Sequence, residues 1–164
     1  MHPTHKDLTI HAAILTVSDT RTVETDKGGQ QIKALLEDVG FHTVQYRIVK
    51  DDAATISQQV RAWCEDAHIN AIIVTGGTGF TSRDVTYEAL TPLFEKEMHG
   101  FGELFRSLSY EEIGPRTMFS RAVAGCLQQT AIYALPGSTN AVKLGMSQLI
   151  IPTVQHFIGE LHRR

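Results

Sequence analysis

The glycine-rich segment TGGTG at residues 75–79 is the part of this chain that points most directly to chemistry. It follows a short apolar run at residues 71–74. Glycines allow backbone N–H groups to approach an anion closely, and the two threonine hydroxyls could donate further hydrogen bonds. The segment lacks both the Lys-Ser/Thr ending of a P-loop and the spacing GxGxxG. It therefore predicts either a phosphate cradle or simply a tight turn between a strand and a helix.

Two aspartates, Asp51 and Asp84, each follow a predicted strand and precede a predicted helix. A single aspartate at such a position usually caps the helix. Two carboxylates beside a phosphate cradle would repel the phosphate unless a cation lay between them. Mg²⁺ suits that place, because it binds one or two carboxylates together with substrate phosphates. The pattern predicts a magnesium site at Asp51 and Asp84, where the neighbouring Asp52 could partly substitute for Asp51.

A second segment, LPGS at residues 135–138, repeats the pattern of a strand end, a glycine and a hydroxyl that can cap the next helix. Three arginines, Arg83, Arg106 and Arg121, could neutralise phosphate through bidentate contacts, and each could equally be a surface charge. Glu103 opens a predicted helix, where it could favour the N-terminus or accept hydrogen bonds from a polar heterocycle.

Other catalytic classes find little support in the sequence. Cys64 and Cys126 are far apart, and the eight histidines are scattered, with no metal-ligand spacing. There is no Ser-His-Asp or Cys-His arrangement for nucleophilic catalysis. The sequence therefore indicates neither a protein nucleophile nor a metal site built from histidine or cysteine.

The elements that must position these residues alternate between strands and helices. Apolar runs predict strands at residues 10–17, 44–48, 71–74, 122–127 and 131–135, the last two forming a hairpin. This order predicts an α/β fold, in which a mostly parallel sheet is covered on both faces and carries an antiparallel hairpin. Ligands of such sheets bind beyond the carboxyl ends of the strands. We therefore expect one edge of the sheet to collect residues 18–19, 51–52, 75–84 and 136–140.

Composition sets the class of protein. The 164 residues suit one domain, at residues 10–164, with a flexible tail at residues 1–9. The hydrophobic fraction of 42% is typical of a globular protein and excludes a disordered chain. A net charge of -3 gives no basic excess for nucleic acid or an anionic membrane, so neither is an expected partner. Two cysteines and no apolar run of about 18 residues predict a cytoplasmic protein.

Taken together, these motifs resemble the molybdenum cofactor biosynthesis MoaB/MogA family, which shares its signature with a domain of gephyrin. TGGTG is followed by Arg83-Asp84 and then by Tyr87-Glu88-Ala89. The resemblance spans nearly the whole chain through ILTVSD (14–19), GFGELFR (100–106), LSYEEIG (108–114), SRAVAG (120–125) and LPGSTNA (135–141). LSYEEIG and SRAVAG look more like the MoaB branch than the MogA branch.

The resemblance implies a three-layer α/β/α fold that assembles into homotrimers or homohexamers. It also implies a molybdopterin adenylyltransferase, which uses Mg²⁺ and ATP to convert molybdopterin into adenylyl-molybdopterin and pyrophosphate. The product would pass to a molybdate-inserting enzyme. The alternative is a non-catalytic protein that binds molybdopterin in the same pathway, and a third hypothesis is a structural oligomer that binds no small molecule.

The resemblance also assigns roles to residues of this sequence. Asp51 and Asp84 would be the catalytic pair and the ligands of Mg²⁺. Nucleotide phosphates would be bound by Thr75, Gly76, Gly77, Thr78, Gly79, Pro136, Gly137 and Ser138. The pterin would be bound by Ser18, Asp19, Glu103 and Arg106. The chain departs from many relatives at residues 26–29, where Asp-Lys-Gly-Gly replaces an Asp followed by Ser-Gly.

Overall fold

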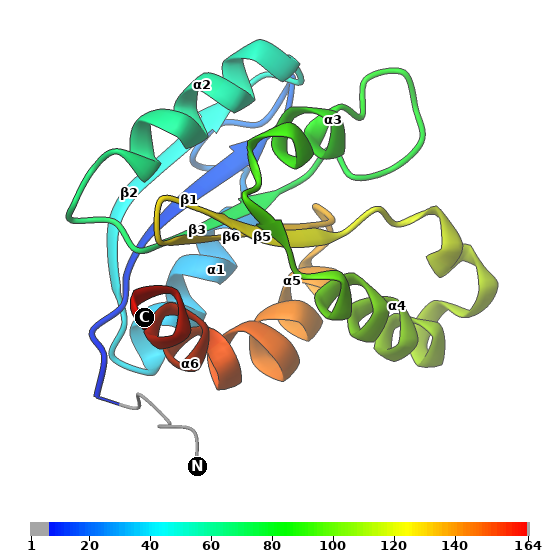
Figure 1. Ribbon diagram of the computed structural model, residues 1–164. Coiled ribbons are helices and arrows are strands. Elements are labelled where there is room, and N and C mark those ends of the chain that lie inside the picture. Colours follow the sequence, from blue (N-terminus) through cyan, green and yellow to red (C-terminus); the bar gives the residue numbers. More distant parts are fainter. Residues whose placement is uncertain (1–6, 164) are drawn as a thin grey trace.

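A six-stranded sheet forms the centre of the computed structural model, which describes residues 7–163 (Figure 1). The strand order is β2-β1-β3-β6-β5-β4. Four strands run parallel: β1 (His11–Val17), β2 (His42–Val49), β3 (Ala71–Thr75) and β6 (Thr130–Leu135). Two are antiparallel: β5 (Val123–Leu127) pairs with β6, and the two-residue β4 (Lys96–Glu97) pairs with β5. The predicted parallel sheet and hairpin are confirmed, while the short β4 went unpredicted.

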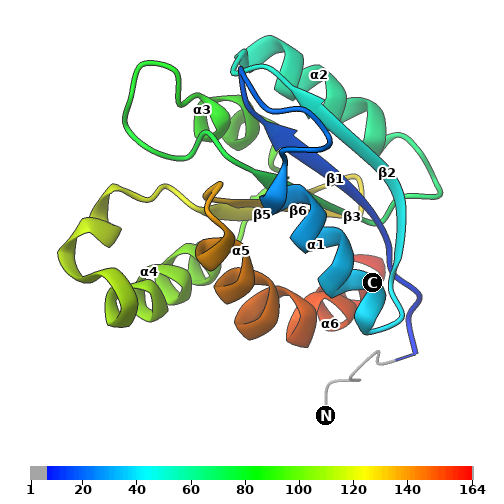
Figure 2. The same cartoon turned by 180° about the vertical axis from the view of Figure 1, so that it is seen from behind.

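Helices cover both faces of the sheet, which confirms the three-layer α/β/α fold (Figures 1 and 2). One face carries α2 (Ala53–Cys64) and α3 (Thr86–Leu90). The other carries α1 (Lys27–Asp38), α4 (His99–Ile113), α5 (Thr139–Gly145) and α6 (Ile151–His162). Alternate residues of the central strands enter opposite cores: Ile14 and Ile73 pack with α1 and α5, whereas Leu15 and Ile72 pack with α2. Such two-sided burial explains why these strands read as continuous apolar runs.

Short segments complete the chain. Residues Thr91–Leu93 and Gly114–Phe119 form 3₁₀ turns, and Met146–Ile150 forms a π-helical turn between α5 and α6. Residues 1–6 of the predicted flexible tail lie outside the described residues. Leu8 packs against the core, and its carbonyl oxygen accepts a hydrogen bond of 2.8 Å from Gln155 Nε2. No helix between residues 7 and 163 is long and apolar enough to cross a membrane.

The turn between β5 and β6 gives a first prediction. Its two residues, Gln128 and Gln129, have φ values of 51° and 68°, a region in which glutamine is strained and Asn-Gly is favoured. We expect the double substitution Gln128→Asn/Gln129→Gly to raise the free energy of unfolding by about 1 kcal/mol in urea denaturation. Gln128→Ala/Gln129→Ala is the matched control, since alanine does not relieve the strain. A double variant no more stable than the wild type would contradict this reading of the turn.

Candidate functional site

A pocket of about 340 Å³ lies at the carboxyl edge of the parallel strands, where ligands of such sheets are expected. Each of the four parallel strands delivers residues to it, either from its own end or from the loop that follows. The lining residues are Thr16, Val17, Ser18, Asp19, Thr20, Arg21, Asp51, Thr75, Gly76, Gly77, Asp84 and Gly137. Asp51 and Asp84 therefore share one pocket, as predicted from their positions after β2 and β3.

Only part of the predicted phosphate-binding set lines this pocket. Thr75, Gly76, Gly77 and Gly137 line it, whereas Thr78, Gly79, Pro136 and Ser138 are not among its lining residues. Two hydroxyls of the predicted set have structural partners: Thr75 Oγ1 donates to the Pro136 carbonyl at 3.0 Å, and Ser138 Oγ accepts from the Ala141 N–H at 3.2 Å as the N-cap of α5. The partner of the Thr75 hydroxyl is 61 residues distant in the sequence, so the local pattern could not predict this hydrogen bond.

The two glycines after β3 need to be glycines. Gly76 and Gly77 have φ values of +98° and +70°, and a Cβ at Gly76 would collide with the Val17 carbonyl oxygen. A Cβ at Gly77 would collide with the Thr86 hydroxyl and lie 3.3 Å from Asp51 Oδ1. The backbone turn is thus packed directly against β1 and α3, and it leaves the Asp51 carboxylate uncovered by any side chain at Gly77.

Five charged side chains determine the electrostatics of the pocket: the carboxylates of Asp19, Asp51 and Asp84 and the guanidinium groups of Arg21 and Arg83. Burial, together with the negative charges of Asp19 and Asp84, raises the pKa of Asp51, while Arg83 opposes that shift. Asp19 is held differently, since Arg83 Nε and Nη2 donate to its two oxygens at 2.9 and 3.0 Å and lower its pKa. A carboxylate that is crowded by like charge, as Asp51 is, favours a cation beside it.

The adjacent aspartates Asp51 and Asp52 have different surroundings. Asp52 is the N-cap of α2, where its Oδ2 accepts from the backbone N–H and the hydroxyl of Thr55 at 2.9 and 2.6 Å. Asp51 lines the pocket instead. Asp84 does not cap α3, because its Oδ2 accepts from the backbone N–H and hydroxyl of Thr81. Asp52 is therefore not free to substitute for Asp51, contrary to the expectation from the sequence.

The carboxylates of the pocket fit a magnesium ion that takes some of its ligands from the protein and the others from a substrate. Within residues 7–163, no three His, Cys, Asp or Glu side chains are placed to hold an ion by themselves. Mg²⁺ does not need such a cage, because it commonly takes one or two carboxylates and completes its shell with phosphate and water oxygens. Asp51 and Asp84 can supply those two carboxylates.

Comparison with known proteins shows the family to which the chain belongs. Residues 13–156 match the family described as the probable molybdopterin binding domain. The chain belongs to this family. Molybdenum cofactor biosynthesis protein B of Bacillus subtilis is 49% identical over 155 residues, covering 94% of this chain and 91% of the relative. The protein of the same name from Staphylococcus aureus (strain COL) is 53% identical over 156 residues, covering 93% and 92%.

Solved structures of the family share the fold. A crystal structure of Molybdenum cofactor biosynthesis protein B matches with a TM-score of 0.93 and 46% identity, covering 96% of this chain and 98% of that one. The tungsten cofactor synthesizing protein MoaB from Pyrococcus furiosus matches with a TM-score of 0.84 and 37% identity, covering 94% and 98%. The resemblance to the MoaB/MogA family is confirmed over nearly the whole chain.

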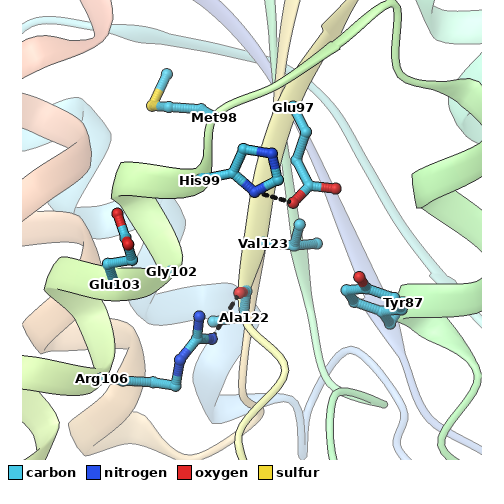
Figure 3. Close-up of a pocket in the computed structure, with 9 residues that line it drawn as sticks. All are labelled: Tyr87, Glu97, Met98, His99, Gly102, Glu103, Arg106, Ala122 and Val123. Atoms are coloured by element: carbon cyan, nitrogen blue, oxygen red, sulfur yellow. Dashed lines mark hydrogen bonds and ion pairs between the residues drawn. The ribbon is translucent and has the colours of Figure 1, made fainter.

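A second pocket of the probable molybdopterin binding domain, of about 380 Å³, lies between α3, α4 and the start of β5 (Figure 3). It is lined by Tyr87, Glu97, Met98, His99, Gly102, Glu103, Arg106, Ala122 and Val123. Arg106 Nη1 donates to the carbonyl oxygens of Ser120 and Ala122 at 3.3 and 3.2 Å. Of the residues predicted to bind the pterin, Glu103 and Arg106 line this pocket, whereas Ser18 and Asp19 line the first. The structure does not bring the four together.

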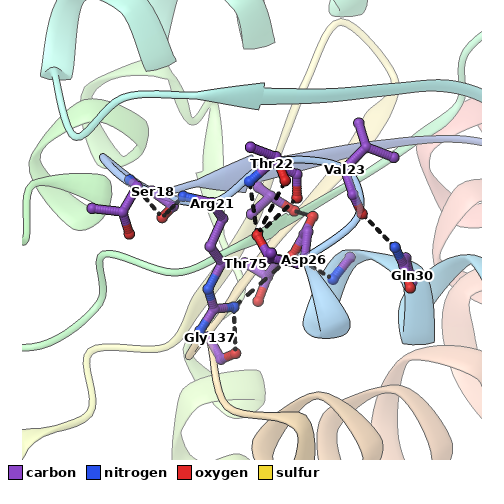
Figure 4. Close-up of polar contacts among 12 residues, drawn as sticks. Ser18, Arg21, Thr22, Val23, Asp26, Gln30, Thr75 and Gly137 are labelled. Atoms are coloured by element: carbon purple, nitrogen blue, oxygen red, sulfur yellow. Dashed lines mark hydrogen bonds and ion pairs between the residues drawn. The ribbon is translucent and has the colours of Figure 1, made fainter.

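No role was predicted from the sequence for Asp26, a buried carboxylate beneath the first pocket. Asp26 is fully buried at the N-cap of α1 (Figure 4). It accepts from Thr16 Oγ1 at 2.6 Å, from the Gly29 N–H at 3.0 Å and from the Tyr46 hydroxyl. Arg21 Nη1 lies 3.9 Å from it. The available signal was an Asp directly before Lys27-Gly28-Gly29, where α1 starts, and an Asp at that position is typical of an N-cap.

Proposed function

We propose that this protein catalyses the Mg-ATP-dependent adenylylation of molybdopterin in molybdenum cofactor biosynthesis. The main support for the proposal is that Asp51, Asp84 and the Gly76-Gly77 turn line one pocket. The chain that forms this pocket is a member of the probable molybdopterin binding domain family. The name shared by the curated relatives, Molybdenum cofactor biosynthesis protein B, supports the pathway.

In the proposed reaction, an oxygen of the terminal phosphate monoester of molybdopterin attacks the α-phosphorus of ATP. The bond between that phosphorus and the oxygen bridging to the β-phosphate breaks, and pyrophosphate leaves with the electron pair. Adenylyl-molybdopterin is the other product. Such a transfer needs two anions held in line and their charge neutralised, and it needs no protein nucleophile. Burial raises the pKa of Cys64 to about 12, which is consistent with a thiol that takes no part.

The first pocket contains both carboxylates that could bind a cation and a guanidinium group that could bind a phosphate. Asp51 and Asp84 would hold Mg²⁺, which when bound would neutralise charge on the nucleotide phosphates. Arg21 lines the same pocket, and its Nη1 has only a long contact of 3.5 Å with the Gly137 carbonyl and the 3.9 Å contact with Asp26. We assign to Arg21 the contact with a substrate phosphate, because the Arg83 guanidinium is already paired with Asp19.

The second pocket would receive the pterin ring. Glu103 and Arg106 lie across it from Tyr87 (Figure 3), and a carboxylate can accept hydrogen bonds from the N–H groups of a polar heterocycle. Exposed apolar side chains on α4 and the segment after it would form the contact between subunits of a trimer or hexamer. These side chains are Leu104, Tyr110, Ile113, Met118 and Phe119.

Pyrophosphate release from Mg-ATP, measured with and without molybdopterin, tests the proposal. We expect release only when both substrates and Mg²⁺ are present. Tight molybdopterin binding without turnover would reject the enzyme and support the non-catalytic binding protein. No thermal shift with either substrate would reject both and leave a structural role.

The raised pKa of Asp51 predicts a pH dependence of metal binding. A proton competes with the cation for this carboxylate, and the competition begins at a higher pH than for an ordinary aspartate because the pKa is raised. We expect the affinity for Mn²⁺, used as a spectroscopic probe for Mg²⁺, to fall as the pH falls through that pKa. Asp51→Asn should bind Mn²⁺ weakly and lose this pH dependence. An identical pH profile in the variant would exclude Asp51 as the titrating ligand.

A further inference from the structure

The loop that carries Asp84 is held by one side chain from a distant part of the chain. Residues 76–85 form no helix or strand, and Phe80, within the loop, is 67% exposed. Arg121 Nε donates to the Gly79 carbonyl at 3.0 Å, and Arg121 Nη2 donates to the Asp84 carbonyl at 3.2 Å. The backbone N–H of Arg121 also donates to the Thr78 carbonyl at 2.9 Å. One residue thus fixes both ends of the 79–84 segment.

The guanidinium of Arg121 is itself held on several sides. Glu88 on α3 accepts from Nη1 and Nη2 through its two oxygens, the Nη2 contact measuring 3.0 Å. The Arg121 Cζ lies 5.1 Å from the ring centre of Phe80 and 5.3 Å from that of Tyr87. Its side chain is only 20% exposed. Such a planar fork between two rings and a carboxylate has one orientation, which lysine could not reproduce.

These contacts argue against a direct role of Arg121 in binding phosphate. Of its five guanidinium N–H groups, the Nε donor, both Nη2 donors and one Nη1 donor have acceptors. The first pocket is not lined by Arg121, but it is lined by Asp84, whose main-chain carbonyl accepts a hydrogen bond from Arg121.

We infer that Arg121 is a positioning residue, which places Asp84 in the pocket that it shares with Asp51 and thereby sets the affinity of that pocket for a metal-bound nucleotide. The inference deepens the proposed function and rests on it for its catalytic meaning. It assigns to Arg121 no contact with substrate. The position of Asp84 then depends on a side chain that follows it by 37 residues in the sequence.

The variant Arg121→Lys tests the inference in the full chain. Lysine keeps the charge, but its single ammonium cannot serve both carbonyls and both oxygens of Glu88. In the ligand-free protein we expect faster hydrogen exchange confined to the 78–85 segment. We also expect the affinity for Mn²⁺ and for Mg²⁺ with a non-hydrolysable ATP analogue to fall about tenfold, while binding of that analogue without metal stays within about twofold. Arg61→Lys, an exposed arginine on α2, is the matched control and should leave both measurements unchanged.

The results separate the inference from a general structural effect and from the proposed function. Equal loss of metal-dependent and metal-free nucleotide binding, or no change in either, would overturn the inference. Unchanged exchange in the 78–85 segment would overturn it as well. If Arg121→Lys behaves as expected but wild-type protein releases no pyrophosphate with Mg-ATP and molybdopterin, adenylylation fails while the positioning role of Arg121 stands.

Discussion

Asp84→Asn and Asp51→Asn are each expected to lower kcat/KM for adenylyl transfer by about 10²- to 10³-fold, which corresponds to about 2.7–4 kcal/mol of lost transition-state stabilisation. The reason is that an amide keeps the shape of each side chain but removes the charge proposed to hold Mg²⁺. Both positions line the pocket, and the charge of Asp84 contributes to the raised pKa of Asp51. The measurement is pyrophosphate release at saturating Mg²⁺.

Asp52→Asn is the matched control for this experiment. Asp52 caps α2, so its replacement should change stability by about 1 kcal/mol or less and leave transfer intact. A loss of activity in Asp52→Asn equal to that in Asp51→Asn would contradict the separate roles given to the two residues. Full turnover by Asp84→Asn would show that Asp84 is not a metal ligand.

Folding of the Asp51→Asn variant is not expected to limit this test. The pKa of Asp51 is raised in the folded protein, so ionisation of this group costs stability above that pKa, and the cost disappears as the pH falls below the pKa of the unfolded chain. An asparagine that cannot ionise removes the cost at neutral pH. The thermal midpoint of Asp51→Asn without metal should therefore equal or exceed that of the wild type.

The gathering of the pocket residues could be predicted because it depends on topology alone. Once the runs at 10–17, 44–48, 71–74 and 131–135 are recognised as parallel strands, their carboxyl ends must share one edge. Asp51, Asp84 and Gly137 follow such ends, and the structure places all three in one pocket. No knowledge of side-chain contacts is required for this step.

The partners of the polar groups could not be predicted, because they come from residues distant in sequence. Arg83 pairs with Asp19 across 64 residues, and Arg121 reaches Gly79 across 42. Nothing in the local pattern distinguishes these arginines from surface charges. The two-residue β4 was missed for a related reason, since a strand so short shows no alternation and exists only because β5 lies beside it.

The largest effect on stability is expected at Asp26. Replacement by alanine would leave the Thr16 hydroxyl, the Tyr46 hydroxyl and the Gly29 N–H without their acceptor. We expect Asp26→Ala to lower the free energy of unfolding by about 3–5 kcal/mol in urea denaturation. Asp26→Asn should cost less, because its amide oxygen can still cap α1, and Tyr46→Phe should cost about 1–2 kcal/mol. A loss below about 1 kcal/mol in Asp26→Ala would mean that water replaces the carboxylate.

The same network predicts the behaviour of the protein at alkaline pH. Burial and the hydrogen bond to Asp26 raise the pKa of Tyr46 above the ordinary phenol value of about 10. A group whose pKa is raised by folding contributes stability that is complete below its unfolded pKa and is lost as the pH rises through the folded one. Wild-type stability should therefore fall above about pH 10, and Tyr46→Phe should remove that part of the decline.

Because Asp26 caps α1 directly beneath Arg21 and Gly137, the rise in pH should loosen the first pocket of the wild-type protein before the chain unfolds globally. Hydrogen exchange at the start of α1, followed as the pH is raised, would detect this order of events, and simultaneous loss of the whole fold would contradict it.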